Sequence, residues 1–281
     1  MQVAGLLRAG VARLRAAGVP DAERNAEWLL GAVLGLNRGR LYIAAGDAVP
    51  VASQRCFESW CARRSRREPL QYILGSQPFR TCTLRVDSRV LIPRPETERV
   101  VDLCLSLHHS GPIVDLGTGS GAIAIALGVE RPSDDVFGTD ISAPALSLAR
   151  ENARSAGVQR ACFVHGDLFE PLGAHVRECS LVVCNPPYVA TSDLEDLAPE
   201  VRDWEPRIAL DGGPDGLDFY RRLAPEAARV MCGGAWIVVE IGRGQGPAVQ
   251  ELFEVTLAFA ESVTIRDLSG IERGLGLRRK D

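Results

Sequence analysis

The chain has 281 residues, of which 46% are hydrophobic and 24% charged, and its formal net charge is −4. This composition is typical of a globular protein with enough apolar material for one large domain or two smaller ones. It disfavours an enzyme that grips long nucleic acid, since such proteins carry a basic surface, and no apolar run of about 18 residues indicates a membrane span.

Eight cysteines are spread along the chain without a CxxC pair. Their spacing is typical of neither a zinc site nor a disulfide framework. The first 18 residues are interrupted by arginines and lack the apolar stretch of a signal peptide. We therefore expect reduced thiols, no bound metal and a cytoplasmic protein.

Residues 1 to about 70 predict a small helical bundle, because apolar residues recur there at helical spacing. A helix beginning near Asp21 places Trp28, Leu29 and Leu30 on its inner face, and a further helix covers residues 52–67. The latter contains the basic cluster Arg63-Arg64-Ser65-Arg66-Arg67. We interpret this cluster as a solvated face, with a docking surface for an acidic protein partner as the alternative.

Residues 71–95 predict a hairpin linker. Tyr72-Ile73-Leu74-Gly75 and Leu84-Arg85-Val86-Asp87 each resemble a short strand. The following Arg94-Pro95-Glu96-Thr97-Glu98 begins a helix, because proline is favoured in the first turn and carboxylates are favoured near the positive end of the helix dipole.

From about residue 111 strands and helices alternate. This rhythm predicts a parallel sheet flanked by helices. The expected strands cover 112–116, 135–139, 161–165, 181–184 and 235–241, and the expected helices cover 122–129 and 144–156.

A glycine-rich turn follows the first of these strands and reads Asp115-Leu116-Gly117-Thr118-Gly119-Ser120-Gly121. Alternate glycines allow a tight turn and close approach to a ligand, which is either a dinucleotide pyrophosphate or S-adenosylmethionine. Dinucleotide sites prefer GxGxxG. Here the pattern is GxGxG, and Asp115 before it would attract the ammonium of a methionine moiety and repel a pyrophosphate. The turn therefore favours S-adenosylmethionine, with a plain loop as the alternative.

Two further acidic residues stand at the ends of the next two strands. Asp140 can accept both hydroxyls of a ribose, although it could instead cap the following helix. Asp167 can accept from an adenine amino group and Leu168 can pack on the ring, the alternative being an ordinary turn. Because ligands bind at the carboxyl ends of the strands in open α/β sheets, these strand ends together predict a nucleoside site.

The fourth strand runs into Asn185-Pro186-Pro187-Tyr188. A nitrogen in a planar conjugated group is a poor nucleophile because its lone pair is delocalised. The Asn185 side-chain oxygen and the Pro186 carbonyl can accept its two N–H groups and orient it toward a methyl donor, while Tyr188 packs against the flat group. The motif indicates that a nitrogen of this class is methylated, but it does not distinguish the side-chain amide of glutamine from the amine of adenine.

Over nearly its whole length the sequence resembles the release-factor glutamine methyltransferases, the PrmC/HemK family. Besides the glycine-rich turn and Asn-Pro-Pro-Tyr, the resemblance is carried by Arg67-Glu68-Pro69-Leu70-Gln71-Tyr72, Leu91-Ile92-Pro93-Arg94-Pro95-Glu96-Thr97-Glu98 and Glu240-Ile241-Gly242. The Ile-Pro-Arg-Pro-Glu-Thr-Glu stretch separates this family from adenine methyltransferases. The resemblance implies an α/β fold with a helical substrate-recognition domain (1–70), a β-hairpin linker (71–95) and a Rossmann-like S-adenosylmethionine-dependent methyltransferase domain (96–281).

The resemblance also implies the activity, which is N5-methylation of the glutamine in the Gly-Gly-Gln motif of peptide chain release factors, with S-adenosylhomocysteine as the product. It implies cofactor contacts from Gly117, Thr118, Gly119, Ser120, Gly121, Asp140, Leu168 and Asn185, to which the strand-end positions add Asp115 and Asp167. It implies substrate contacts from Asn185, Pro186, Pro187, Tyr188, Arg94, Glu96 and Thr97, with Asn185, Pro186 and Tyr188 as the catalytic residues. We expect a monomer with no membrane contact and no direct contact with nucleic acid.

Two other functions remain open. An N6-adenine methyltransferase acting on DNA or RNA would keep Asn-Pro-Pro-Tyr but needs a target-recognition domain and a basic groove. A non-catalytic S-adenosylmethionine-binding protein would show damage in these motifs, and none is visible. Trp204 is either a packing residue or part of a loop that frames a peptide, and Gly274 is expected to fray the C-terminal strand.

Overall fold

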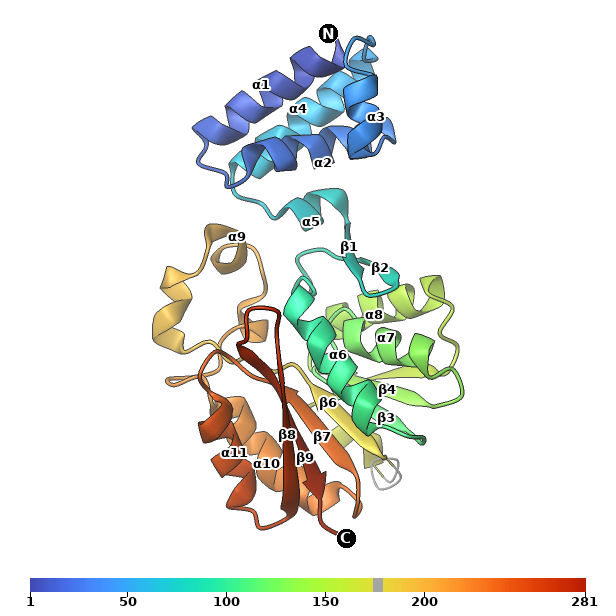
Figure 1. The fold of residues 1–281 in the computed structure, drawn as a ribbon, viewed down its shortest axis with the longest axis vertical. Coiled ribbons are helices and arrows are strands. Elements are labelled where there is room, and N and C mark those ends of the chain that lie inside the picture. Colours follow the sequence, from blue (N-terminus) through green and yellow to red (C-terminus); the bar gives the residue numbers. More distant parts are fainter. Residues whose placement is uncertain (174–178) are drawn as a thin grey trace. The chain divides into compact units, whose positions relative to one another are not determined.

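The computed structural model describes residues 1–173 and 179–281, and these residues form two compact units (Figure 1). The helical unit consists of 1–76 together with 198–204, and the sheet unit consists of 77–197 and 205–281. Each unit has its own apolar core. Within these described ranges, no helix is long and apolar enough to cross a membrane.

The helical unit packs its helices around a core that includes Leu14, Leu30 and Phe57. Gly10 allows this packing, because a Cβ added there would come within 2.4 Å of the Phe57 ring. Trp28 was expected on the inner face but is 57% exposed, since the buried stripe of its helix runs through other positions. The helices are α1 (Val3–Ala16), α2 (Ala22–Leu34), α3 (Arg38–Ile43), α4 (Val51–Ser65), α5 (Leu70–Leu74) and α9 (Pro199–Arg202).

Helix α5 corrects the strand expected at Tyr72–Gly75. Pro69 precedes the helix in an extended conformation, and Gly75 ends it with a φ of 72°. Tyr72 and Ile73 are buried. A helix of about one turn and a short strand present the same apolar run, so periodicity does not distinguish them. The hairpin itself forms between β1 (Ser76–Phe79) and β2 (Cys82–Arg85).

Seven strands within the described residues form the central sheet, in the order β5-β4-β3-β6-β7-β9-β8. The first five strands in this order are parallel, and β9 is antiparallel to both β7 and β8. The α/β fold class predicted from the alternation is confirmed. The strands are β3 (Ile113–Leu116), β4 (Val136–Asp140), β5 (Ala161–His165), β6 (Leu181–Cys184), β7 (Trp236–Glu240), β8 (Phe259–Arg266) and β9 (Glu272–Arg279).

Helices cover both faces of this sheet, as Figure 1 shows. Successive strand residues point to opposite faces, so Ile113 packs in one core and Val114 in the other. This explains why β3 and β6 are buried at every position and, apart from Asp115, apolar. One face carries α6 (Pro95–Leu107), α7 (Ala122–Glu130) and α8 (Ala143–Ser155), and the other carries α10 (Asp218–Val230) and α11 (Gly246–Glu254).

The C-terminal strand is continuous, which corrects the expectation that Gly274 would fray it. Gly274 pairs with Glu240 on β7 and with Ile265 on β8. A Cβ at this position would lie 3.0 Å from the Ile265 side chain. The glycine therefore accommodates a close neighbour, and pairing on both sides offsets its low strand propensity.

The arginine cluster at 63–67 is largely engaged in internal ion pairs. Arg64, which is 5% exposed, donates to Glu200 Oε1 at 2.6 Å and to Asn25 Oδ1 at 2.8 Å. Arg67 makes two hydrogen bonds to Glu200, at 2.7 and 2.6 Å, and Arg63 pairs with Glu68. A solvated face is therefore the wrong interpretation for Arg64, which holds residues 198–204 within the helical unit.

Replacing Glu200 by Gln is expected to destabilise the helical unit by about 2 kcal/mol, because it leaves the buried Arg64 guanidinium without its counter-charge. Burial alone would raise the pKa of Glu200, but hydrogen bonds from Arg67 and Arg64 outweigh it and lower the pKa to about 2. The stabilisation by the carboxylate is thus present above pH 4.5 and is lost as the pH falls toward 2.

Thermal unfolding of Glu200→Gln beside wild type at neutral pH and near pH 3 measures this effect. The matched control is Asp203→Asn on the same segment, which removes only an exposed pair with Arg202 and should change the melting temperature little. Equal shifts for the two variants would contradict the assignment.

Candidate active site

A cavity of about 430 Å³ opens at the carboxyl-terminal edge of the parallel strands. Its walls come from the segments that follow β3, β4, β5 and β6, from the start of α6 and from the loop before α10. Open α/β sheets bind ligands at this edge, and the volume is within the range of small-molecule sites. The sequence-predicted residues that line it are Thr97, Asp115, Gly117, Thr118, Gly119, Ser120, Asp140, Asp167, Leu168, Asn185, Pro186 and Pro187.

The glycine-rich turn exposes its backbone to this cavity. Gly117 and Gly119 have φ values of 66° and 55°, a region that favours glycine. A Cβ at Gly117 would meet no atom within 4 Å, so open space lies in front of it. Gly121 lies outside the cavity lining. Its missing Cβ instead makes room for Ile125 and Ala149, so Gly121 allows α7 and α8 to pack closely.

Asp115 is a buried carboxylate at the end of β3. It is 2% exposed, and its Oδ2 accepts from the Thr118 hydroxyl at 2.6 Å and from the Ala124 amide at 3.1 Å. Burial raises the pKa of Asp115 to about 7 against the effect of these hydrogen bonds. Ionisation of this group therefore depends on whether a cation is present in the cavity.

Asp140 at the end of β4 is half-buried and organises the turn. Its Oδ2 accepts from the Gly119 amide and its Oδ1 from the Ser142 amide, both at 2.8 Å. The helix α8 is capped by Ser142, whose hydroxyl accepts from the Ala145 amide. The alternative role of Asp140 as the helix cap is thus taken by Ser142. Each carboxylate oxygen keeps a second lone pair for a ligand hydroxyl.

Asp167 and Leu168 follow β5. Asp167 forms an ion pair with Arg222 of α10. Leu168 is 4% exposed, has a φ of 45°, and its carbonyl accepts from the Thr139 hydroxyl at 3.0 Å. This left-handed conformation is unusual for leucine. It turns the chain sharply at the cavity, and both residues line it.

The Asn185-Pro186-Pro187-Tyr188 segment divides between the cavity and the core. The first three residues line the cavity, and the Asn185 Nδ2 lies 3.3 Å from the Thr97 hydroxyl. Tyr188 does not line it, and its hydroxyl donates to Glu240 Oε1 at 3.3 Å. Burial raises the pKa of Tyr188. Tyr188 therefore supports the segment from the side.

Arg94 and Glu96 lie outside the cavity lining, in contrast to Thr97 from the same stretch. Arg94 forms an ion pair with Glu205, whose other oxygen accepts from the Ile92 amide at 3.0 Å. Burial raises the pKa of Glu205, and the positive charge of Arg94 opposes this. Glu205 thus fastens the 92–94 segment beside the cavity, a role that no pattern in the sequence indicated.

Phe219, Arg222 and Ile208 also line the cavity and were missed from the sequence. Phe219 and Arg222 lie three residues apart on α10. Their spacing predicts a helix, but it does not indicate that this part of the helix faces a ligand. Trp204 is half-buried and belongs to the helical unit rather than to this lining.

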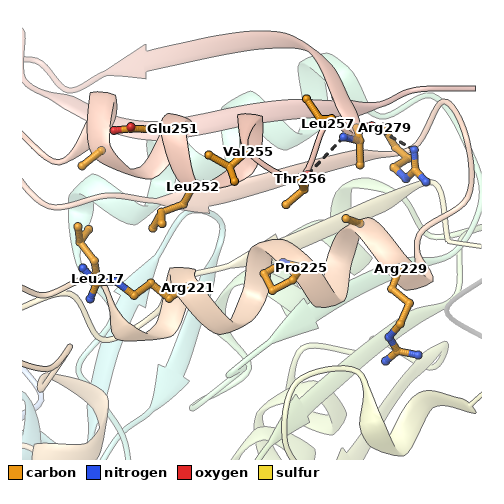
Figure 2. A pocket seen from close by; sticks show the side chains of 13 residues that line it. Leu217, Arg221, Pro225, Arg229, Glu251, Leu252, Val255, Thr256, Leu257 and Arg279 are labelled. Atoms are coloured by element: carbon orange, nitrogen blue, oxygen red, sulfur yellow. Dashed lines mark hydrogen bonds between the residues drawn. The ribbon is translucent and has the colours of Figure 1, made fainter.

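A second, larger groove of about 1080 Å³ lies between α10, α11, the segment 255–258 before β8 and the end of β9. Figure 2 shows Arg221 and Pro225 on α10 and, across from them, Leu252 and Val255. Its lining contains none of the sequence-predicted site residues and none of the residues that directly follow β3, β4, β5 and β6. The chemistry therefore belongs to the smaller cavity.

Two family models match this chain in consecutive stretches. The PrmC N-terminal domain matches residues 5–75, and the methyltransferase small domain matches residues 97–200. A release factor glutamine methyltransferase from Geobacter sulfurreducens is 44% identical, with 93% of this chain and 91% of that protein covered. This chain belongs to the release factor glutamine methyltransferase family. A second member, from Caulobacter vibrioides, is 41% identical over 93% of this chain and 91% of its own length.

Solved structures support the fold of this methyltransferase. A human methyltransferase 10 domain-containing protein is 16% identical and covers 70% of this chain and 88% of that chain, with a TM-score of 0.52. The Rossmann-like fold and the methyltransferase class predicted from the sequence are confirmed. The prediction of S-adenosylmethionine as the methyl donor is confirmed by the family membership.

Replacing Asp115 by Asn in the cofactor-free methyltransferase is expected to change how stability depends on pH. Because the pKa of Asp115 is raised from 3.8 to about 7, the folded state favours the neutral carboxyl. The stabilisation of the folded state by Asp115 is therefore fully present below pH 3.8, and it is lost as the pH rises through 7.

Asparagine stays neutral, and its oxygen can replace Oδ2 as acceptor. The free energy of unfolding of Asp115→Asn relative to wild type should therefore rise by up to about 1.4 kcal/mol per pH unit between pH 4 and 7. Chemical denaturation over this range measures the difference, and a difference that is constant with pH would show that Asp115 does not titrate there.

Replacing Asp140 by Asn is expected to weaken S-adenosylmethionine binding about tenfold or more, because a charged acceptor for ligand hydroxyls is lost. Asp135→Asn is the matched control, since Asp135 precedes the same strand at its other end and pairs with Arg160 on the surface. Isothermal titration calorimetry gives both dissociation constants. If the two variants bind equally well, Asp140 does not hold the ribose.

Proposed function

We propose that this chain transfers a methyl group from S-adenosylmethionine to the side-chain amide nitrogen of the glutamine in the Gly-Gly-Gln motif of peptide chain release factors. The observation that carries this proposal is the place of Asn185 and Pro186. Both line the same cavity as Asp115 and Asp140. An acceptor site for an N–H group and an acidic nucleoside site therefore share one space.

Asn185 and Pro186 supply two oxygen acceptors on one short segment. A primary amide has two N–H groups, and two acceptors fix its plane and its position together. As the amide nitrogen becomes positively charged during alkylation, these oxygens stabilise the developing charge. The second proline, Pro187, restricts the backbone, so the acceptors need little reorganisation.

The residues around the cavity suit S-adenosylmethionine, which when bound supplies an electrophilic methyl group on a sulfonium. Asp115 provides a carboxylate for its ammonium and Asp140 one for its ribose. Leu168 and Ile208 give the cavity apolar surface for the adenine ring. The glycine turn leaves the open space in front of Gly117 that close backbone contact requires.

No general base is required before the new bond forms. A neutral amide nitrogen is barely acidic, and it becomes acidic only once it carries the methyl group. One of the two N–H protons then passes to water, and the oxygens of Asn185 and Pro186 keep the nitrogen oriented until it does. This assigns positioning and charge stabilisation to the protein as its main contributions.

The family membership favours glutamine over adenine as the target, because the relatives at 44% and 41% identity are named as release factor glutamine methyltransferases. We further propose that the helical unit recognises the release factor, that the protein acts as a monomer without direct contact with nucleic acid, and that it works in the cytoplasm. The buried free thiols of Cys61, Cys104 and Cys184 suit a reducing compartment.

The test is methyl transfer from labelled S-adenosylmethionine to purified, unmethylated release factor. Label is expected on wild-type release factor and not on a variant with Gln→Ala in the Gly-Gly-Gln motif. Asn185→Ala should lower the rate at least about a hundredfold, as removal of a preorganised polar partner does elsewhere, while cofactor affinity falls far less, because the glycine turn and the carboxylates of Asp115 and Asp140 remain.

An adenine-containing duplex serves as the second acceptor in the same experiment. Label on the duplex with none on the release factor would overturn the proposal in favour of adenine methylation. Cofactor binding without transfer to either acceptor would favour a non-catalytic binding protein.

A further inference from the structure

A buried chain of polar groups lies behind Asn185. The Asn185 Nδ2 is 3.3 Å from the Thr97 Oγ1, and the Thr97 hydroxyl donates to Glu240 Oε2 at 2.7 Å. Thr97 is 3% exposed and Glu240 is 1% exposed. These residues come from three elements, since Thr97 lies in the first turn of α6, Asn185 follows β6 and Glu240 ends β7.

While Glu240 is ionised, the donors and acceptors in this chain can be arranged in only one direction. An ionised carboxylate only accepts hydrogen bonds, and a threonine hydroxyl has a single proton to donate. Once Thr97 donates that proton to Glu240, its oxygen can only accept from Asn185. The Asn185 amide must then turn its NH₂ group toward Thr97, which leaves its Oδ1 for the cavity.

The opposite orientation of the Asn185 amide would be unproductive. It would place an NH₂ group toward the cavity, where it would meet the NH₂ of a substrate amide, and it would set two oxygens against each other at Thr97. An amide side chain by itself has little preference between these two orientations, because its oxygen and nitrogen are nearly equal in size. The neighbouring hydrogen bonds therefore decide between them.

Glu240 is itself held in place from several sides. The Tyr188 hydroxyl donates to its Oε1 at 3.3 Å, and the Tyr220 hydroxyl donates to its backbone carbonyl at 2.7 Å. Its strand neighbour on β9 is Gly274. Burial of a carboxylate is costly, and burial raises the pKa of Glu240 to about 7, against the hydrogen bonds from Thr97 and Tyr188 and the charge of Arg273. Such a cost is often retained where a site uses the group.

We propose that Glu240 and Thr97 are positioning residues that orient the Asn185 amide, so that its oxygen and not its nitrogen faces the substrate. This inference rests on the proposed methylation of an amide NH₂ group. It adds a specificity consequence, because a site fixed in this way offers only acceptors. It would select glutamine and reject glutamate, whose carboxylate has no N–H to donate.

The test compares Thr97→Val, which keeps the shape of the side chain but removes the hydroxyl, with Thr97→Ser, which keeps the hydroxyl. At saturating cofactor, Thr97→Val is expected to lower kcat for release factor about tenfold or more, since misorientation of a positioning group is costly. Thr97→Ser should stay within about threefold of wild type. Cofactor affinity should change little in either variant, because the hydrogen-bonded chain Glu240–Thr97–Asn185, here called the relay, acts on the substrate that receives the methyl group.

Glu240→Gln completes a double-mutant cycle. It should lower kcat to a similar extent as Thr97→Val, because glutamine can present an NH₂ group to Thr97 and allow the relay to reverse. The double variant Thr97→Val/Glu240→Gln should lose no more activity than the stronger single variant, since both act through Asn185. Additive losses, or equal losses in Thr97→Val and Thr97→Ser, would overturn the relay in favour of a packing role.

A readout without turnover separates failure of the relay from failure of the proposed function. In protein labelled with ¹⁵N-asparagine, the Asn185 side-chain NH₂ should exchange with solvent more slowly in wild type and Thr97→Ser than in Thr97→Val, because its hydrogen bond protects it. Equal exchange in all three proteins would refute the relay whatever the activity. Wild-type protein that shows this protection but transfers no methyl group to release factor would instead refute the proposed substrate.

Discussion

The parallel register of β3 with its two neighbours is the constraint on which the site depends. Leu116 at the end of β3 is paired with Thr139 on β4 and with Cys184 on β6. The next residues along these three strands are Gly117, Asp140 and Asn185, so the glycine turn, the Asp140 carboxylate and the Asn-Pro-Pro-Tyr segment emerge together at one edge. Apolar side chains on both faces secure this register, because a slip by one residue would exchange the two faces of each strand.

Buried polar groups next to this edge connect elements that apolar packing alone would leave free to shift. Glu205 holds Ile92 and Arg94, and Glu240 holds Thr97 and Tyr188. An unsatisfied buried carboxylate would cost several kcal/mol or would stay neutral, so these contacts are required once the groups are buried. They fix the Ile-Pro-Arg-Pro-Glu-Thr-Glu stretch beside the cavity, where only part of it reaches the lining.

The Asn-Pro-Pro-Tyr segment and the glycine turn also combine residues that line the cavity with residues that do not. In each, some residues line the cavity and others support them from behind, as Tyr188 and Gly121 do. Methyl transfer to an amide depends on position more than on proton transfer. A site of this kind therefore relies on supporting residues as much as on those that face the ligand. Membership of the release factor glutamine methyltransferases connects this arrangement with an amide substrate.

The sequence by itself determined the alternation of strands and helices, the glycine turn, the acidic strand ends and the acceptor segment. These are local features, because periodicity and turn chemistry depend on neighbouring residues. Only the tertiary structure decided that Tyr72 and Ile73 are helical, that Arg64 is buried against Glu200 and that Glu205 and Glu240 stand behind the cavity. The ion pair of Arg64 and the contacts of Glu205 and Glu240 depend on partners distant in the sequence. Thr97 and Glu240, for example, are separated by 143 positions in the sequence. Their contact exists only because α6 packs against the sheet over β7.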